Sequence, residues 1–327
     1  MITITPNATI ISMLGEYQEI EGLLGHNRPA STYGRAITSI GNLNWEINTT
    51  SIKTLKPGSI ADVGIVIFGR VKEFVLNGHV KDLEKLKKSA EVRTHREFGK
   101  IIGVGPVTIK TWIGLGVNTM PKLHKAVAKG TILLTNAQTY GLKYYNDLIT
   151  RIPRDEVTQL GAWVRTIAKA VDGPGDSMLF EIAGSYRRGM TSSGDVDIII
   201  SNKNAYKENL IADMLAIISK EKGFISTLSA GNQRVTFFIK SRISDIVRQI
   251  DILNIAYKSY FTAINYFTGG WQHNLIVRGK AKASGYRLNQ IGLYRIVGKA
   301  LVLVPIHSEQ DIYKILGMDY IPPLQRR

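Results

Sequence analysis

The sequence contains no cysteine and is short of acidic residues, and both shortages narrow what the protein can be. Without cysteine the chain forms no disulfide, holds no zinc through thiolates and has no thiol nucleophile. Among 327 residues, 26 Asp and Glu stand against 42 Lys and Arg, which gives a formal net charge of +16. Such a surplus is typical of proteins that bind a polyanion. Composition therefore favours a nucleic-acid partner, with a generally basic surface as the alternative.

Long apolar runs are also missing. The longest uncharged stretch, residues 259–277, contains Asn265, Gln272, His273 and Asn274, which are costly in hydrocarbon. The N-terminus shows no basic start followed by an apolar block, so no secretory signal is visible. With 44% hydrophobic and 21% charged residues, the composition is that of an ordinary globular protein. We predict a soluble intracellular protein without a membrane partner, in the nucleus or the cytoplasm.

The first half of the chain has the spacing of helices. Apolar residues recur at intervals of three and four from Asn7 onward, at Ile10, Leu14, Tyr17, Ile20 and Leu24. We expect residues 27–29 to break this pattern before a second helix near 33–40. A third helix is predicted over 66–76, ending at Asn77-Gly78. After the basic stretch 81–88, residues 89–150 indicate short helices separated by glycine-rich turns.

The centre of the chain has the composition of a sheet. Four short runs rich in β-branched residues predict strands of one sheet, with a helix at 206–222: residues 178–183, 196–200, 235–240 and 249–255. From residue 260 onward, helix and strand signals alternate. The sequence thus predicts an α+β multidomain protein with boundaries near residues 88, 152 and 259.

Two closely spaced carboxylates stand out in this central region. Asp195 and Asp197 lie in the segment GSYRRGMTSSGDVDIII, residues 184–200, and strand alternation puts both on one face with Val196 on the other. Asp251 interrupts a second apolar strand and could complete the group. Carboxylates this close repel one another unless a cation separates them, and Mg²⁺ prefers oxygen ligands. Three carboxylates suffice for a two-metal centre that activates a hydroxyl and steadies a leaving phosphate.

A bare Asp-x-Asp pair more often consists of solvent-facing residues at a strand end. Here Gly184-Ser185 precedes the pair and can bring backbone N–H groups and a hydroxyl against a phosphate. The guanidinium groups of Arg187 and Arg188 suit phosphate oxygens. Phosphate-binding groups beside metal-binding carboxylates predict nucleotidyl transfer.

With these residues the chain resembles the DNA polymerase X family. The run at 184–198 is similar to the family's palm signature, residues 140–157 to the end of its fingers, and residues 266–278 to its nucleotide-binding stretch. Residues 308–323 resemble its C-terminal segment. The resemblance implies four domains: a helical lyase-like or DNA-holding domain over 1–88, fingers with a helix-hairpin-helix over 89–152, a catalytic palm over 153–259, and a nascent-base or thumb lobe over 260–327.

The resemblance also implies roles for individual residues. Asp195 and Asp197 would bind two Mg²⁺ ions, for which Mn²⁺ could substitute, and Asp251 would act as ligand or general base at the primer 3′-hydroxyl. The incoming triphosphate would be held by Arg151, Ser185, Arg188 and Gly194. Tyr266, Phe267 and Gly269 would pack against the sugar and exclude a 2′-hydroxyl. Asn274 would reach the minor-groove edge of the base, and Arg278 the template strand.

Two helix-hairpin-helix signals precede this region. In Ile102-Gly103-Val104-Gly105-Pro106 the glycines allow a tight turn whose N–H groups face a phosphate, and Lys100 and Lys110 flank it. This hairpin would hold the primer strand. The other, Asp62-Val63-Gly64, has lost its first glycine and is the weaker signal.

The chain departs from the family pattern in the first domain. The family's lysine nucleophile, which forms a Schiff base with deoxyribose, aligns with Arg70, and an arginine stays protonated. Pro29 and Val66 stand where basic 5′-phosphate ligands would be expected. Lys72 lies two residues on, which on a helix turns its side chain about 200° away. We predict little or no 5′-deoxyribose phosphate lyase activity.

Further departures concern the palm and the lobe. Gln249 stands where the family often has arginine beside the third aspartate, and Gln290 where DNA polymerase β has glutamate. We expect a short turn at 226–232, where template-independent relatives carry a long loop. The Tyr266-Phe267 pair, in place of their Gly-Trp, also favours templated synthesis.

The leading hypothesis is a monomeric, template-directed DNA polymerase that fills short gaps during DNA repair, adding dNTPs to a primer on gapped or primer–template DNA. One alternative is a template-independent nucleotidyltransferase of the terminal-transferase kind. The other is a non-catalytic protein that bridges nicks or gaps. Dependence on a template separates the first two, and Mg²⁺-dependent extension separates both from the third.

Overall fold

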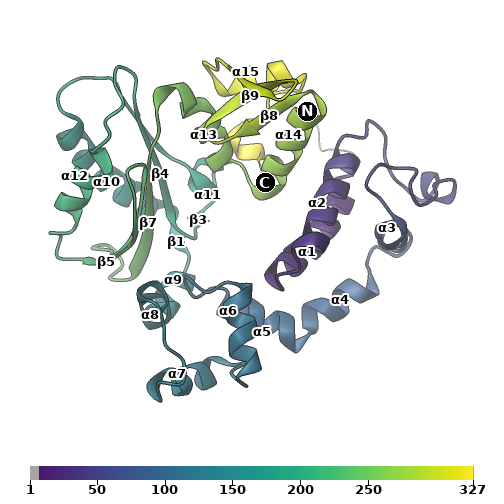
Figure 1. The fold of residues 1–327 in the computed structure, drawn as a ribbon, viewed down its shortest axis with the longest axis horizontal. Helices are drawn as coiled ribbons and strands as arrows, with labels where there is room; N and C mark the ends of the chain where they lie inside the picture. The colour runs from purple at the N-terminus through teal and green to yellow at the C-terminus, as the bar shows by residue number, and fades with distance from the viewer. Residues whose placement is uncertain (1–6, 327) are drawn as a thin grey trace. The chain divides into compact units, whose positions relative to one another are not determined.

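The computed structural model describes residues 7–326 and divides the chain into two compact units, Met1–Leu142 and Lys143–Arg327. Residues 1–6 of the predicted first domain and residue 327 of the predicted lobe lie outside the described part. Figure 1 shows the elements of both units. No helix among residues 7–326 has the length and apolar character needed to cross a bilayer.

The first unit is helical. Its α-helices are α1 (Ala8–Leu23), α2 (Asn27–Gly41), α3 (Ile65–Asn77), α4 (Lys81–Lys88), α5 (Ala90–Phe98), α6 (Pro106–Gly114), α7 (Met120–Ala128) and α8 (Asn136–Lys143), which ends at the boundary of the unit. A 3₁₀ turn, η1, spans Ser51–Lys53. The five apolar residues that predicted α1 are all buried. Two of the core rings stack, Tyr17 of α1 on Tyr33 of α2, with centroids 5.2 Å apart.

The break between α1 and α2 differs from the prediction. Residues 27–29 do not interrupt the helices but form the first turn of α2. Pro29 is tolerated there because a first-turn residue needs no backbone N–H for the helix ladder. The interruption lies instead at Gly25, whose φ of +77° is unfavourable for other residues. By contrast, α3 stops at Asn77-Gly78 as predicted, with Gly78 in the left-handed conformation at φ +74°.

The second unit begins with α9 (Tyr145–Ile149) and contains a five-stranded sheet in the order β2-β4-β7-β6-β5. Its strands are β2 (Met178–Ile182), β4 (Val196–Asn202), β5 (Phe224–Ala230), β6 (Arg234–Lys240) and β7 (Val247–Asn254). Only β4 and β7 are parallel to each other; the other neighbours run antiparallel. A short ribbon of β1 (Ile152–Pro153) and β3 (Ser192–Ser193) stands beside it.

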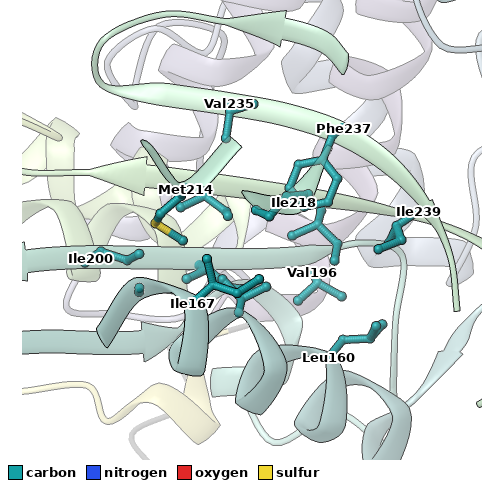
Figure 2. Close-up of a cluster of buried hydrophobic side chains, with 14 of the residues drawn as sticks. Leu160, Ile167, Val196, Ile200, Met214, Ile218, Val235, Phe237 and Ile239 are labelled. Carbon is teal, nitrogen blue, oxygen red and sulfur yellow. The ribbon is translucent and has the colours of Figure 1, made fainter. Parts of the chain in front are cut away.

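Two helices cover one face of this sheet, α10 (Arg154–Asp172) and α12 (Leu210–Ile218). Val196 and Ile200 of β4 and Phe237 of β6 point into the cluster that the helices seal, which Figure 2 shows. Ile199, one residue out of phase, packs on the opposite face with helix α13 (Tyr260–Thr268). Odd positions of β4 therefore face away from α10 and α12.

The four predicted strands are confirmed, but one predicted turn is wrong. Residues 226–230 belong to β5, and the connection to β6 is only residues 231–233. The pattern was missed because Ser226, Thr227 and Ser229 give an edge strand little apolar alternation. The predicted helix at 206–222 is also shorter, since α12 covers Leu210–Ile218.

The C-terminal lobe combines helices with a second sheet, as the mixed signals predicted. Helices α13 and α14 (Trp271–Ala283) precede a three-stranded antiparallel sheet of β8 (Tyr286–Asn289), β9 (Gly292–Val297) and β10 (Ala300–Val304). Helix α15 (Glu309–Leu316) follows, begun by a capping box between Ser308 and Asp311. Short 3₁₀ turns η2 (Tyr257–Ser259) and η3 (Pro323–Gln325) flank these elements.

Candidate active site

Three carboxylates meet on the face of the sheet that α10 and α12 leave free. Asp195 lies directly before β4, Asp197 within β4, and Asp251 on β7. The parallel register pairs Asp197 with Asp251. One oxygen from each carboxylate lies within 4.8 Å of the others. The structure thus brings together the three residues that the sequence singled out.

Strand alternation explains this arrangement. Val196 is fully buried among the residues that pack against the helices, so its neighbours Asp195 and Asp197 turn to the other side. Asp251 faces the same side as Asp195 and Asp197, because its neighbours Ile250 and Ile252 are buried on the other side. An all-oxygen donor set at this spacing fits hard divalent cations such as Mg²⁺.

Burial and neighbouring negative charges raise the pKa values of two of these carboxyl groups. Burial raises the pKa of Asp197 to about 7, reinforced by the charges of Asp195 and Asp251 and opposed by Arg234 and Arg188. Burial also raises the pKa of Asp195, with Asp251 as the next contributor. A carboxylate whose charged form is this unfavourable gains much from a cation between it and its neighbours. The electrostatics therefore agree with the donor set in favouring a metal-binding site.

Asp251 is the most firmly held of the three. Only 2% of the residue is exposed, and Oδ1 accepts hydrogen bonds from Arg234 Nη2 at 2.6 Å and Thr236 Oγ1 at 2.6 Å. Gln249 Nε2 donates to Oδ2 at 2.7 Å. These contacts fix the orientation of the carboxylate. Sequence reasoning noted Gln249 but missed Arg234 and Thr236, because cross-strand partners depend on register.

Steric crowding explains why a glycine precedes Ser185. Gly184 takes a φ of +55°, and a Cβ at this position would overlap Oδ2 of Asp197. The backbone at the start of the short helix α11 (Gly184–Arg187) therefore approaches the carboxylates as closely as a glycine allows. Ser185 follows and donates from Oγ to Ser193 Oγ at 2.9 Å, which joins α11 to β3.

The other predicted triphosphate ligands lie around the same carboxylates. Arg151 donates from Nε to Ser192 Oγ at 3.2 Å, and a Cβ on Gly194 would come 3.4 Å from Arg151 Nη1. Arg188 donates from Nη1 to the carbonyl of Thr268 at 2.9 Å. Both guanidinium groups act electrostatically on the acidic cluster. The structure therefore provides positive charge at its rim.

Three predicted nucleotide- and template-binding residues line one small pocket of the C-terminal lobe: Tyr266, Asn274 and Arg278. Asn274 Nδ2 donates to the carbonyl of Tyr266 at 2.8 Å, which ties α14 to α13. The ring of Phe267 stands edge-on to that of Tyr266, 5.1 Å between centroids. A Cβ on Gly269 would overlap the side chains of His273 and Asn274, which would then have to shift.

The predicted DNA-binding hairpin lies in the first unit, between α5 and α6. Gly103 has a φ of +77°, Gly105 precedes α6 in an extended conformation, and Val104 N donates to Ile101 O at 3.0 Å. Gln138 Nε2 fixes the turn by donating to the Gly103 carbonyl at 2.8 Å. The flanking lysines, Lys100 and Lys110, are exposed.

The weaker signal at residues 60–64 has the same backbone. Asp62 adopts the left-handed conformation with φ +60°, Val63 N donates to Ile60 O at 3.1 Å, and Gly64 leads into α3 in an extended conformation. Aspartate tolerates this conformation better than most residues. Its carboxylate lies 3.3 Å from Arg35 Nε, which offsets its negative charge. Loss of the first glycine has therefore not removed the hairpin.

Arg70, which the sequence resemblance aligned with a lysine nucleophile, is held in the first unit by aromatic and acidic neighbours. Its guanidinium carbon lies 4.0 Å from the ring centroid of Tyr17, and Nη2 lies 2.7 Å from Asp82 Oδ2. These contacts give Arg70 a packing role between α1, α3 and α4. Lys72 is exposed.

Comparisons with known proteins agree with this geometry. The chain matches the models of three successive domains: the fingers domain of DNA polymerase lambda over residues 96–149, the DNA polymerase beta palm over 151–257 and the DNA polymerase beta thumb over 263–327. It is 27% identical to DNA polymerase lambda of Rattus norvegicus, across 96% of this chain and 52% of that protein.

Two further relatives are similar over most of the chain. DNA polymerase lambda of Arabidopsis thaliana is 26% identical across 98% of this chain and 62% of its own length. The human DNA-directed DNA/RNA polymerase mu is 24% identical across 78% of this chain and 57% of its own length. The chain thus spans between half and two thirds of the length of these relatives. With palm, thumb and fingers matched in order and homology to polymerases lambda and mu, the chain belongs to the DNA polymerase X family.

Proposed function

We propose that the protein is a template-directed DNA polymerase that fills short gaps during DNA repair. It would join a dNTP to a primer 3′-hydroxyl, forming the bond from the primer oxygen to the α-phosphorus as the bond to pyrophosphate breaks. The observation that carries the proposal is the group of Asp195, Asp197 and Asp251, within 4.8 Å of one another beside the Gly184-Ser185 turn. Carboxylates and phosphate-binding groups side by side are what nucleotidyl transfer requires.

Asp195 and Asp197 would hold two Mg²⁺ ions, or Mn²⁺ in their place, and Asp251 would hold one of them. Bound there, a divalent cation would favour ionisation of the primer hydroxyl and offset the charge of the triphosphate. Asp251, fixed by its hydrogen bonds, would orient that hydroxyl or accept its proton.

The remaining site residues would bind and select the nucleotide. Charge on Arg151 and Arg188, with the hydroxyl of Ser185 and the open backbone at Gly194, suits a triphosphate. In the C-terminal lobe, Tyr266 and Phe267 would exclude a 2′-hydroxyl, supported by the close backbone at Gly269. Asn274 would contact the minor-groove edge of the base and Arg278 the template strand.

DNA binding would rest on charge and on the two hairpins. Between Glu97 and Asp147 the chain has no acidic residue but carries Lys100, Lys110, Lys122, Lys125, Lys129 and Lys143. The hairpins around Gly103 and Asp62 would each present backbone N–H groups to a phosphate.

We propose gapped or primer–template DNA as the partner and a monomer as the active form. The proposed domains cover residues 1–88, 89–152, 153–259 and 260–327. The protein's place of action would be wherever that DNA is, the nucleus or the cytoplasm.

Templated synthesis is favoured over terminal transfer. The connection between β5 and β6 has only residues 231–233, too few to occupy the place of a template strand. We further propose that lyase activity is absent, because Arg70 cannot serve as an amine nucleophile and is already engaged with Tyr17 and Asp82.

The proposal is tested with a labelled primer ending at a one-nucleotide gap, Mg²⁺ and dNTPs. Wild type should extend the primer, and Asp251→Ala should not, while its affinity for gapped DNA stays within about threefold, because the carboxylate acts in chemistry rather than in DNA binding. Glu221→Ala, in the palm but outside the site, serves as the control with wild-type extension. Tight DNA binding without extension by the wild type would identify a bridging protein instead.

A further inference from the structure

Asp251, the third carboxylate of the site, has no positively charged partner from its own strand, because Gln249 stands where the family often has arginine. The residue two positions before Asp251 is Gln249, whose neutral amide donates one hydrogen bond, from Nε2 to Oδ2 at 2.7 Å. An amide orients a carboxylate but leaves its charge uncompensated. The countercharge therefore has to come from elsewhere.

The neighbouring strand provides it. Thr236 of β6 stands opposite Asp251 and Arg234 opposite Leu253, so alternation puts Arg234 and Thr236 on the same face as Asp251. Arg234 directs two N–H groups at Asp251 Oδ1, from Nη2 at 2.6 Å and from Nε at 3.2 Å. Thr236 adds a third donor to the same oxygen at 2.6 Å.

The donors are distributed unequally between the two oxygens. Among residues 7–326, Oδ1 accepts from Arg234 and Thr236, whereas Oδ2 accepts from Gln249 alone. Oδ2 therefore keeps the more accessible lone pair for a metal ion or a primer hydroxyl. Charge-assisted hydrogen bonds are about twice as strong as neutral ones, so Arg234 contributes most to this orientation.

We infer that Arg234 is a positioning residue of the active site: its guanidinium, reaching across from β6, compensates the charge of Asp251 and holds Oδ1, a task for which β7 offers only Gln249. The inference rests on the proposed polymerase function. Arg234 acts through Asp251 rather than on the nucleotide, and its side chain is 57% exposed.

A cross-strand rescue tests the inference. Arg234→Gln removes the charge, and Arg234→Gln combined with Gln249→Arg restores a guanidinium beside Asp251 from its own strand. Arg242→Gln is the matched control, because Arg242 is an exposed palm arginine paired with Glu221 outside the site. Single-nucleotide insertion is measured in single turnovers, with DNA affinity measured by anisotropy. Mn²⁺ binding to the DNA-free protein is measured by electron paramagnetic resonance.

Arg234→Gln should slow the insertion step by about 10- to 100-fold and weaken Mn²⁺ binding several-fold, with the Kd for gapped DNA within about threefold of wild type. The double variant should recover most of both losses, and Arg242→Gln should match wild type. Arg234→Lys, which keeps the charge but loses the fork, should fall between wild type and Arg234→Gln and serves if the glutamine variant does not fold.

The inference is overturned if Arg234→Gln weakens DNA binding while the insertion step is unchanged, since Arg234 would then be a DNA contact. It is equally overturned if the folded double variant is no better than Arg234→Gln in insertion and in Mn²⁺ binding. If the wild type does not extend a primer at all, the proposed function fails, a result that is distinct from a failed rescue.

Discussion

At the scale of single residues, the palm depends on a buried ion pair outside the carboxylate cluster. Arg248 and Glu156 are 2% and 3% exposed, and their two hydrogen bonds, at 3.0 and 2.9 Å, join β7 to α10. Removing one member of such a pair leaves a buried charge without compensation. The pair thus holds the strand of Asp251 against the helix behind the sheet.

Arg248→Met should therefore lower the free energy of unfolding by about 3–5 kcal/mol. Adding Glu156→Leu should regain most of the loss, because the double variant buries no unpaired charge. Chemical denaturation of wild type, both single variants and the double variant gives the coupling. Additive losses from the two single changes would show that the pair is not the cause.

His273 gives the C-terminal lobe a pH-dependent stability. Burial lowers the pKa of His273 to about 4, and the charge of Arg326 adds to this effect against the opposing Glu309. Its Nε2 lies 2.7 Å from the hydroxyl of Tyr313. The native state thus keeps the ring neutral under conditions where the unfolded chain binds a proton.

Because the folded pKa lies below the unfolded value of about 6.5, this stability is present above pH 6.5 and is lost as the pH falls toward 4. The expected loss between pH 7 and pH 4.5 is about 2 kcal/mol. His273→Phe should remove it, so the difference in free energy of unfolding between wild type and variant should change by that amount across this range. A constant difference would contradict the assignment.

The carboxylates could be predicted from the sequence, whereas the cross-strand partners of Asp251 could not. Asp195 and Asp197 alternate with Val196 and Asp251 interrupts an apolar run, and strand alternation is a local rule that a sequence displays. The contact from Arg234 depends on the register between β6 and β7, which no local pattern specifies. Fixed polar networks of this kind become visible only with the fold.

At the scale of elements, the two hairpins of the first unit show that the same backbone conformation forms with and without the usual first glycine. Gly103 and Asp62 take the same left-handed conformation before a buried valine and an extended glycine. Sequence reasoning gave the second hairpin little weight because it counted glycines rather than permitted conformations. Strand β5 was missed for a similar reason, since its polar residues lie at a sheet edge.

Gly103→Val should disrupt the hairpin before α6. Valine is strained at φ +77°, and its Cβ would lie 3.3 Å from that of Ala137. We expect the Kd for gapped DNA to rise about tenfold or more as the backbone N–H groups turn away from the phosphate, measured by fluorescence anisotropy. Gly114→Ala, in α6 with open space at its Cβ, is the control and should bind like wild type. Unchanged affinity of a folded Gly103→Val variant would exclude this hairpin from DNA binding.

At the scale of the whole molecule, the net charge of +16 favours the proposed polyanionic partner and predicts how binding responds to salt. Each phosphate contact releases condensed counterions, so the logarithm of the affinity should fall linearly with the logarithm of the salt concentration. For about six phosphate contacts, affinity for gapped DNA should fall about a thousandfold between 50 and 200 mM salt. A flat response would contradict a basic DNA-binding surface.

The motifs of the sequence predicted fingers, palm and thumb regions in the order in which the three family models match the chain. The proposed reaction class rests on the same motifs. The proposed absence of lyase activity rests instead on one replaced group, Arg70. The contacts of Arg70 with Tyr17 and Asp82 add a physical reason why this position now stabilises the helices of the first unit.

The most direct test of templated nucleotidyl transfer at the three carboxylates is insertion opposite each of the four template bases in a one-nucleotide gap. Each dNTP is supplied separately with Mg²⁺, for wild type and for Asp197→Asn. The account predicts that the wild type inserts the complementary nucleotide at least about a hundredfold faster than the other three, opposite every template base, and that the variant inserts none. Insertion that ignores the template base, or insertion that survives in the variant, would contradict it.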